Sequence, residues 1–150
     1  GMRVESIYKA IELLNKYGIT PKVNIMFGTS PNETKESIIA TIKKTKALPI
    51  DYCMFSIATP FPGTEFEKHC NEQGWMTENA KDENIYINLN PAKRSLIKHK
   101  YLNPEDLERL TRQANREFYL RPSVIVKQIR KTKTIKGLKE GAKTLIKLIS

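Results

Sequence analysis

Lys22-Val-Asn-Ile-Met-Phe-Gly-Thr-Ser-Pro-Asn-Glu-Thr34 is the segment that indicates the fold class most clearly. It follows a helix-breaking proline, and its first six residues predict a β-strand over residues 22–27. Ser30, Pro31 and Glu33 then fit the N-cap, the first position and the capping-box partner of a helix. We expect the buried stripe of that helix at Ile38, Ile39, Ile42 and Leu48.

Helix and strand patterns also flank this unit. Apolar residues at helical spacing run from Val4 to Leu14, and Gly18 fits the position just after the end of that helix. A nearly continuous apolar run from Tyr52 to Thr59 predicts a second strand, which we expect to be covered on both faces, as in parallel sheets. The order helix, strand, helix, strand indicates an α/β fold.

The remainder of the chain is predicted to be mostly helical. Thr64 fits the N-cap of a short helix that ends near Gly74, and a short strand is expected over residues 85–89. Asn103 begins a further helix, and two more are expected over residues 122–131 and 134–149. Residues 1–75 would then hold two strand–helix units, and residues 76–150 an irregular segment with a basic helical extension. The inward side of the Asn103 helix is expected at Leu107, Leu110, Ala114 and Phe118.

Positive charge is concentrated in the last third of the sequence. Residues 1–91 carry 10 Lys and Arg against 11 Asp and Glu, a net charge of −1, whereas residues 92–150 carry 16 against 5, a net charge of +11. Basic amphipathic helices suit either a solvated face or an anionic partner. A membrane surface is favoured over nucleic acid, because aromatic residues for base stacking are missing beyond Tyr119.

The apolar runs and the cysteines favour a cytoplasmic protein. The basic helices add an anionic membrane surface as a candidate partner. The longest apolar runs are too short to span a bilayer. Cys53 and Cys70 could form at most one disulfide, and nothing else in the sequence points to secretion. We therefore interpret them as free thiols in a reducing compartment.

Three segments, in this order, resemble one family. Together they look like the last two strands and the C-terminal extension of radical SAM enzymes, in the subgroup often fused to a cobalamin-binding domain. The resemblance implies a partial (βα) barrel of parallel strands, with a 4Fe–4S cluster, S-adenosylmethionine and, as a candidate, cobalamin in the whole enzyme. The segments are Phe27-Gly-Thr-Ser-Pro-Asn-Glu-Thr34, Thr59-Pro-Phe-Pro-Gly-Thr64 and Glu117-Phe-Tyr-Leu-Arg-Pro122.

The two cysteines cannot hold such a cluster, which needs at least three thiolates. The resemblance therefore predicts the C-terminal fragment of a radical SAM Fe–S oxidoreductase that is inactive alone and has the N-terminal remainder of its parent chain as partner. The alternative is a binding module whose basic C-terminal helices hold an anionic partner. Because only two strands of the parallel sheet are predicted, uncovered sheet edges would also favour self-association of the fragment, unless the helices of residues 92–150 fold back over the sheet.

The resemblance places part of the S-adenosylmethionine and substrate wall at the carboxyl ends of the two strands, where parallel barrels bind ligands. A glycine at position 28 would let the backbone approach a ligand closely. Asn24 either binds ligand or is a structural amide, and Phe61 either stacks on adenine or covers the open end of the sheet. The predicted cofactor-binding residues are Asn24, Phe27, Gly28, Thr29, Thr59, Pro60 and Phe61.

Several other residues are assigned structural roles. Glu33 is interpreted as a helix-capping residue and Cys53 as a small core residue. His69 and His99 have no partner at metal-ligand spacing, so both are expected on the surface. Trp75 is expected to anchor the short helix that precedes it. The sequence predicts no catalytic and no metal-binding residue in this chain.

Overall fold

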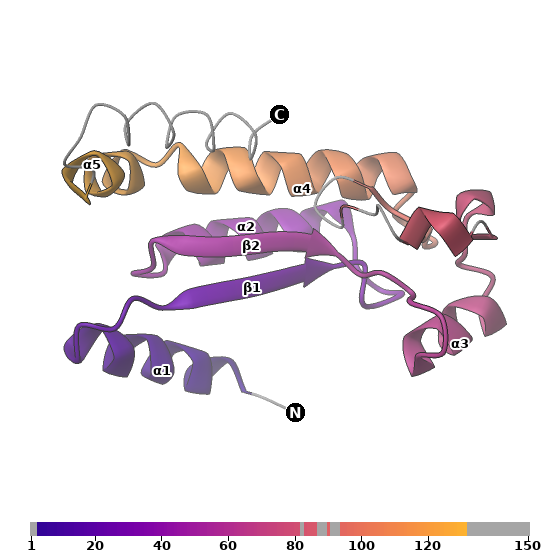
Figure 1. Ribbon diagram of the computed structural model, residues 1–150, viewed down its shortest axis with the longest axis horizontal. Helices are drawn as coiled ribbons and strands as arrows, with labels where there is room; N and C mark the ends of the chain where they lie inside the picture. The colour runs from indigo at the N-terminus through magenta and orange to yellow at the C-terminus, as the bar shows by residue number, and fades with distance from the viewer. Residues whose placement is uncertain (1–2, 82, 87–89, 91–93, 132–150) are drawn as a thin grey trace.

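The computed structural model describes residues 3–81, 83–86, 90 and 94–131. Within them, five α-helices and two short 3₁₀ helices accompany a two-stranded sheet (Figure 1). In chain order the elements are α1 (Val4–Lys16), β1 (Lys22–Phe27), α2 (Lys35–Ala47), β2 (Tyr52–Ile57), α3 (Glu65–Glu72), η1 (Glu78–Lys81), η2 (Glu83–Tyr86), α4 (Pro104–Tyr119) and α5 (Pro122–Lys131).

The two strands run parallel and in register. Lys22 of β1 lies opposite Tyr52 of β2, and Phe27 lies opposite Ile57. Because α2 connects the strands, the predicted α/β unit is confirmed. The described residues form no closed barrel, which would need further strands to close the sheet.

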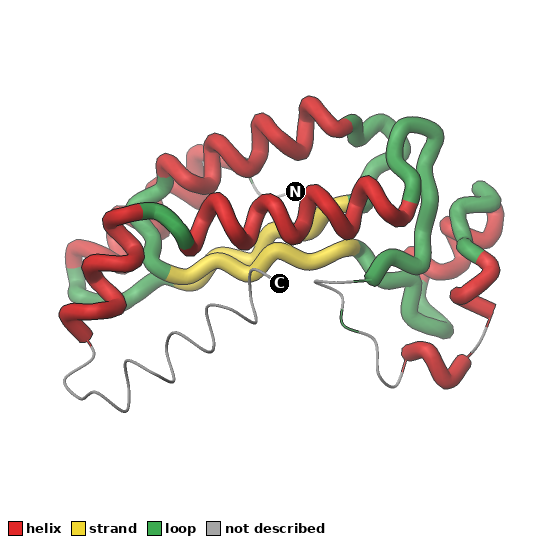
Figure 2. Tube along the Cα trace, turned by 90° about the horizontal axis from the view of Figure 1, so that it is seen from above, coloured by secondary structure: helices red, strands yellow, loops and turns green. Residues whose placement is uncertain are grey.

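One face of the sheet forms the core together with α2 and α4. Phe55 of β2 stacks on Phe27 at 5.9 Å between ring centroids and meets Phe118 of α4 edge-on, also at 5.9 Å. Figure 2 shows both helices on this side of the strands. The inward stripe predicted for α4 is confirmed, because all four of its members are buried: Leu107, Leu110, Ala114 and Phe118.

The opposite face, which we call the open face, has no helix over it among the described residues (Figures 1 and 2). Met26 remains 55% exposed and Met54 44% exposed, and Asn24 and Tyr52 are exposed beside them. The expectation that β2 is covered on both faces is therefore wrong. An apolar run fixes which side chains can be buried, but whether a second layer covers them depends on other parts of the chain.

The cap of α2 differs from the expected one. α2 begins at Lys35, and the Thr34 hydroxyl accepts a hydrogen bond from the Ser37 backbone N–H while the Ser37 hydroxyl accepts one from the Thr34 N–H. This reciprocal pair satisfies two N–H groups that would otherwise lack partners. Ser30 is therefore not the N-cap, and residues 28–33 form a loop at the end of β1.

The other predicted helix ends agree with the structure. Thr64 and Asn103 each accept a hydrogen bond from a backbone N–H in the first turn of α3 and α4, and Gly18 takes a φ of +70° after α1. The strand expected over residues 85–89 is wrong at its first two positions, which belong to the 3₁₀ helix η2. Its remaining positions and the helix expected over residues 134–149 lie outside the described residues.

Candidate functional site

The carboxyl ends of the two strands meet at one end of the molecule, which we call the strand-end site (Phe27–Thr29 and Thr59–Phe61). The Ala58 N–H donates to the Phe27 carbonyl at 2.8 Å, so the parallel pairing continues past the last residue of β2. Helix α3 lies beyond both arrowheads in Figure 1. The structure thus places these two predicted segments side by side.

The predicted site residues divide into buried and accessible ones. Thr29 and Phe61 are exposed at the strand-end site, and Asn24 is exposed on the open face. The Thr59 hydroxyl is half-buried and donates to the Ile57 carbonyl at 3.3 Å. Phe27, Gly28 and Pro60 are buried. The accessible members could meet a ligand through side chains, whereas the buried ones support the loops from below.

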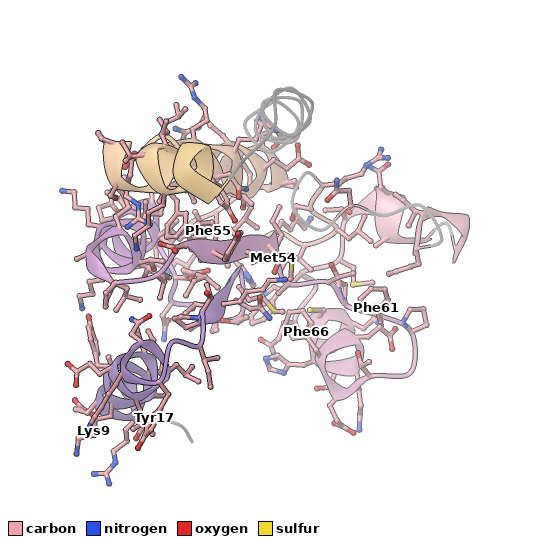
Figure 3. All side chains as sticks on the ribbon, turned by 60° about the vertical axis from the view of Figure 1, so that its left-hand side comes forward. Lys9, Tyr17, Met54, Phe55, Phe61 and Phe66 are labelled. Carbon is pink, nitrogen blue, oxygen red and sulfur yellow. The ribbon has the colours of Figure 1, made fainter. Side chains whose placement is uncertain are left out.

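Phe61 marks the outer border of this region. Its ring lies 5.9 Å from the ring of Tyr86 in a tilted arrangement, and nearly half of its surface stays exposed. In Figure 3 Met54 lies between β2 and the part of the chain that carries Phe61 and Phe66, while Phe55 lies on the side toward α4. A thioether side chain is therefore exposed on the open face at Met54, and an aromatic one at the strand-end site at Phe61.

Gly28 is enclosed by its own chain. Its φ of +81° favours glycine, and a Cβ atom at this position would lie 2.9 Å from Cδ1 of Ile97 and 3.5 Å from a methyl group of Leu107. The space that the missing side chain leaves is thus filled by the segment before α4 and by α4 itself.

Two polar side chains hold Gly28 from either side, and the sequence predicted the role of neither. The Glu33 carboxylate accepts a hydrogen bond from the Gly28 N–H. The His99 Nε2 atom lies 2.8 Å from the Gly28 carbonyl oxygen. Burial raises the pKa of Glu33 above its ordinary value, and this outweighs the lowering by the Gly28 bond.

The expectation of a surface His99 is wrong, because only 9% of this residue is exposed. Two lysines, Lys98 and Lys100, flank it in the sequence, and both are exposed. Charged neighbours of this kind suggest a solvated segment. The contact that buries it comes from a residue 71 positions away. A sequence pattern carries no signal for such a distant pairing.

An array of three rings connects His99 to α3. Trp75 lies edge-on to His99 at 4.5 Å between centroids and edge-on to His69 at 5.0 Å. The Trp75 N–H donates to the Cys70 carbonyl at the end of α3. Trp75 therefore does join the short helix to the rest of the structure, and His69 is its exposed neighbour, as expected.

A separate pocket of about 590 Å³ lies between η1 and the start of α4. Its lining is polar and contains both signs of charge. None of the predicted site residues lines it. The lining residues are Thr77, Asn79, Asn90, Arg94, Ser95, Pro104, Glu105 and Glu108.

Both cysteines are free thiols, as predicted, and both are buried. Burial raises the pKa of Cys53 to about 12 and that of Cys70 to about 11. Within the described parts of the chain, no group of three or more His, Cys, Asp or Glu side chains could hold a metal ion. None of the described helices combines the length and the apolar character that crossing a bilayer requires.

The third segment of the family resemblance forms a clasp at the opposite end of the sheet. The Tyr119 hydroxyl donates to the Cys53 carbonyl at 2.7 Å, and Glu117 pairs with Lys46 at 2.7 Å. The Arg121 guanidinium donates to the carbonyls of Lys46 and Ile50 and lies 3.9 Å from the centre of the Phe118 ring. These residues join the end of α4 to the turn between α2 and β2, so their role here is structural.

Comparison with known proteins gives one informative similarity. The chain is 35% identical over 133 residues to a protein of Pyrococcus horikoshii named as an uncharacterized methyltransferase. The matched region is 86% of this chain but only 27% of that relative, so the chain spans about a quarter of its length. No protein-family model matches the chain, and no solved structure matches it.

This similarity corrects the functional prediction. The relative is named as a methyltransferase, so the prediction of a C-terminal fragment of a radical SAM Fe–S oxidoreductase, and its alternative of a basic binding module, are wrong. S-adenosylmethionine remains a plausible cofactor, because it is the usual methyl donor. The similarity gives no support to a 4Fe–4S cluster or to cobalamin.

Proposed function

We propose that this sequence is part of a methyltransferase that uses S-adenosylmethionine as its methyl donor. The observation that carries the proposal is the 35% identity over 133 residues with the Pyrococcus horikoshii methyltransferase. Because only 27% of that relative is matched, the activity belongs to the whole protein rather than to this portion.

We assign to the open face and the strand-end site a share of the cofactor-binding wall. In open parallel sheets, ligands bind outside the carboxyl ends of the strands. The exposed groups there suit this ligand: the Asn24 amide can hydrogen-bond, and the Phe61 ring can stack on a purine or lie against a cationic sulfonium. When bound, S-adenosylmethionine supplies an activated methyl group that passes to a nucleophile and leaves S-adenosylhomocysteine.

The rest of the protein would complete the sheet. A parallel sheet is normally covered by helices on both faces, and two strands alone rarely form a stable sheet. Here one face is covered and the other is open, with Met26 and Met54 more than 40% exposed. We therefore propose that further strand–helix units of the same protein pair with this sheet and enclose the open face.

Equilibrium binding of S-adenosylmethionine to the whole protein tests the proposal. Asn24→Ala and Phe61→Ala should each weaken binding, because both side chains are accessible in the proposed wall. Lys9→Ala is the matched control, since Lys9 lies on α1, away from Phe61 in Figure 3. Failure of the whole protein to bind, or an equal effect of all three substitutions, would contradict the proposal.

A further inference from the structure

The loop at the end of β1 is held by two side chains that both bind the backbone of Gly28. Glu33 lies five residues after Gly28 and accepts a hydrogen bond from its N–H. His99 lies 71 residues after it, with Nε2 at 2.8 Å from its carbonyl oxygen. Because a carbonyl oxygen can only accept, the Nε2 atom must carry the hydrogen and donate it. One residue of the loop is thus fixed on both its donor and its acceptor side.

His99 is itself held in place by the surrounding structure. Its backbone N–H donates to the Leu102 carbonyl at 2.8 Å, and the ring of Trp75 packs edge-on against its imidazole at 4.5 Å. The other ring nitrogen, Nδ1, is buried and has no hydrogen-bond partner among the described residues. Burying a polar atom without a partner costs free energy. The ring therefore keeps the orientation in which Nε2 donates to Gly28, although this orientation leaves Nδ1 without a hydrogen bond.

The same segment also fixes the position of Gly28 by shape. Cδ1 of Ile97, two residues before His99, would lie 2.9 Å from any Cβ atom added at Gly28. Residue 97 pairs in turn with Met76 in an isolated antiparallel bridge. Thr29 and Ser30 follow Gly28 and are exposed. The loop that emerges at the strand-end site is thus supported from beneath by residues that are distant in the sequence.

We propose that Glu33 and His99 are positioning residues of the methyltransferase: they hold the loop after β1 in the conformation that receives S-adenosylmethionine, without contacting the reacting atoms. This inference rests on the function proposed above. Small displacements of a binding loop strongly reduce affinity, so a loop held from both sides is preorganised for its ligand.

The test uses substitutions that either keep or remove each hydrogen bond. Glu33→Gln keeps an oxygen that accepts from the Gly28 N–H, and Glu33→Met removes it at similar length. His99→Gln keeps an N–H donor, and His99→Leu removes it. Binding of S-adenosylhomocysteine to the whole protein should weaken by about tenfold or more in the Met and Leu variants. The two Gln variants should retain most of the affinity.

A double substitution separates a shared role from two independent ones. If both side chains hold the same loop, Glu33→Met combined with His99→Leu should lose less affinity than the product of the single losses. Unchanged affinity in folded Met and Leu variants would overturn the inference. An equal loss in His99→Gln and His99→Leu would overturn it as well, because the donated hydrogen bond would then be irrelevant.

Hydrogen exchange at the Gly28 amide provides a readout that does not depend on any ligand. Exchange at this amide in the whole protein should be slow without substitution and in Glu33→Gln, and clearly faster in Glu33→Met. If the whole protein fails to bind S-adenosylhomocysteine while this pattern holds, the proposed function fails and the support of the loop stands. If the Gly28 amide exchanges alike in all three proteins, the positioning inference fails whatever the ligand binding shows.

Discussion

Gly18 and Gly28 offer a direct comparison at the scale of single residues. Both have positive φ angles, +70° and +81°, but a Cβ atom at Gly18 would meet nothing within 4 Å. Gly18→Ala should therefore lower the free energy of unfolding by about 1–2 kcal/mol through backbone strain alone. Gly28→Ala should cost about 1–3 kcal/mol more, because Ile97 must move.

Urea unfolding of the two variants measures this difference. The Gly18 variant measures the loss of stability that comes from backbone strain alone. Any greater loss of stability at position 28 therefore reports the packing of the segment around Ile97. Equal losses in the two variants would show that this segment does not press on the end of β1.

Glu33 should give the stability of the chain a distinct dependence on pH. Burial raises the pKa of Glu33 in the folded chain, so the folded state holds the proton more tightly than the unfolded state does. The resulting contribution is fully present below the ordinary pKa of a glutamate and is lost as pH rises through the raised pKa. Glu33→Gln has no such proton. Lowering the pH from 7 to 4 should therefore stabilise the unsubstituted chain relative to this variant.

Unfolding free energies of both proteins across this pH range provide the measurement. Other titrating groups are common to the two proteins, so they largely cancel in the difference. A difference that is constant with pH, or that changes in the opposite direction, would mean that Glu33 is not desolvated as described.

At the scale of elements, the clasp at the end of α4 should contribute strongly to stability. Arg121 donates to two carbonyls at the turn before β2 and covers the Phe118 ring. Arg121→Met should cost about 2–3 kcal/mol, since bonds from a charged donor are lost and the methylenes are largely kept. Tyr119→Phe should cost about 1 kcal/mol for the bond to the Cys53 carbonyl.

The exposed Arg116 on the same helix provides a matched control for this prediction. Arg116→Met should change the free energy of unfolding by no more than about 0.5 kcal/mol. Chemical denaturation of the three variants decides the matter. If Arg121→Met and Arg116→Met lower the free energy of unfolding by the same amount, the hydrogen bonds of Arg121 add no net stability.

Local signals were enough to predict most of the elements. The caps at Thr64 and Asn103 and the buried stripe of α4 follow from hydrogen-bonding groups and apolar spacing within a few residues. The start of α2 was misplaced because Ser30 and Thr34 both offer a hydroxyl at cap spacing, and only the Ser37 side chain decides between them.

The candidate site was less predictable because it depends on distant contacts. The two strand ends could be paired from the α/β order, and they do lie side by side. The partnership of His99 with Gly28 spans 71 residues and leaves no periodic pattern. The exposure of Met54 was missed for a related reason, since the side chains that would cover a sheet face are not specified by the strand itself.

At the scale of the whole molecule, the open face should make the isolated chain self-associate. Met26, Tyr52 and Met54 expose apolar surface over one side of a sheet whose strands also have free edges among the described residues. Sedimentation at micromolar concentrations should show assemblies larger than a monomer. Met26→Lys combined with Met54→Lys should shift the chain toward monomer.

Leu13→Lys provides the control, because Leu13 is 56% exposed on α1 rather than on the sheet. It should leave the association unchanged. A clean monomer for the unsubstituted chain, or an equal effect of the control, would show that the open face does not mediate association.

The fate of S-adenosylmethionine shows whether this sequence is part of a methyltransferase, as we propose. The whole protein would be incubated with methyl-labelled S-adenosylmethionine and a cell extract that supplies acceptor molecules, and the products separated. We expect S-adenosylhomocysteine together with label on an acceptor, both absent without the protein. Unconsumed S-adenosylmethionine, or its cleavage without transfer of the labelled methyl group, would contradict it.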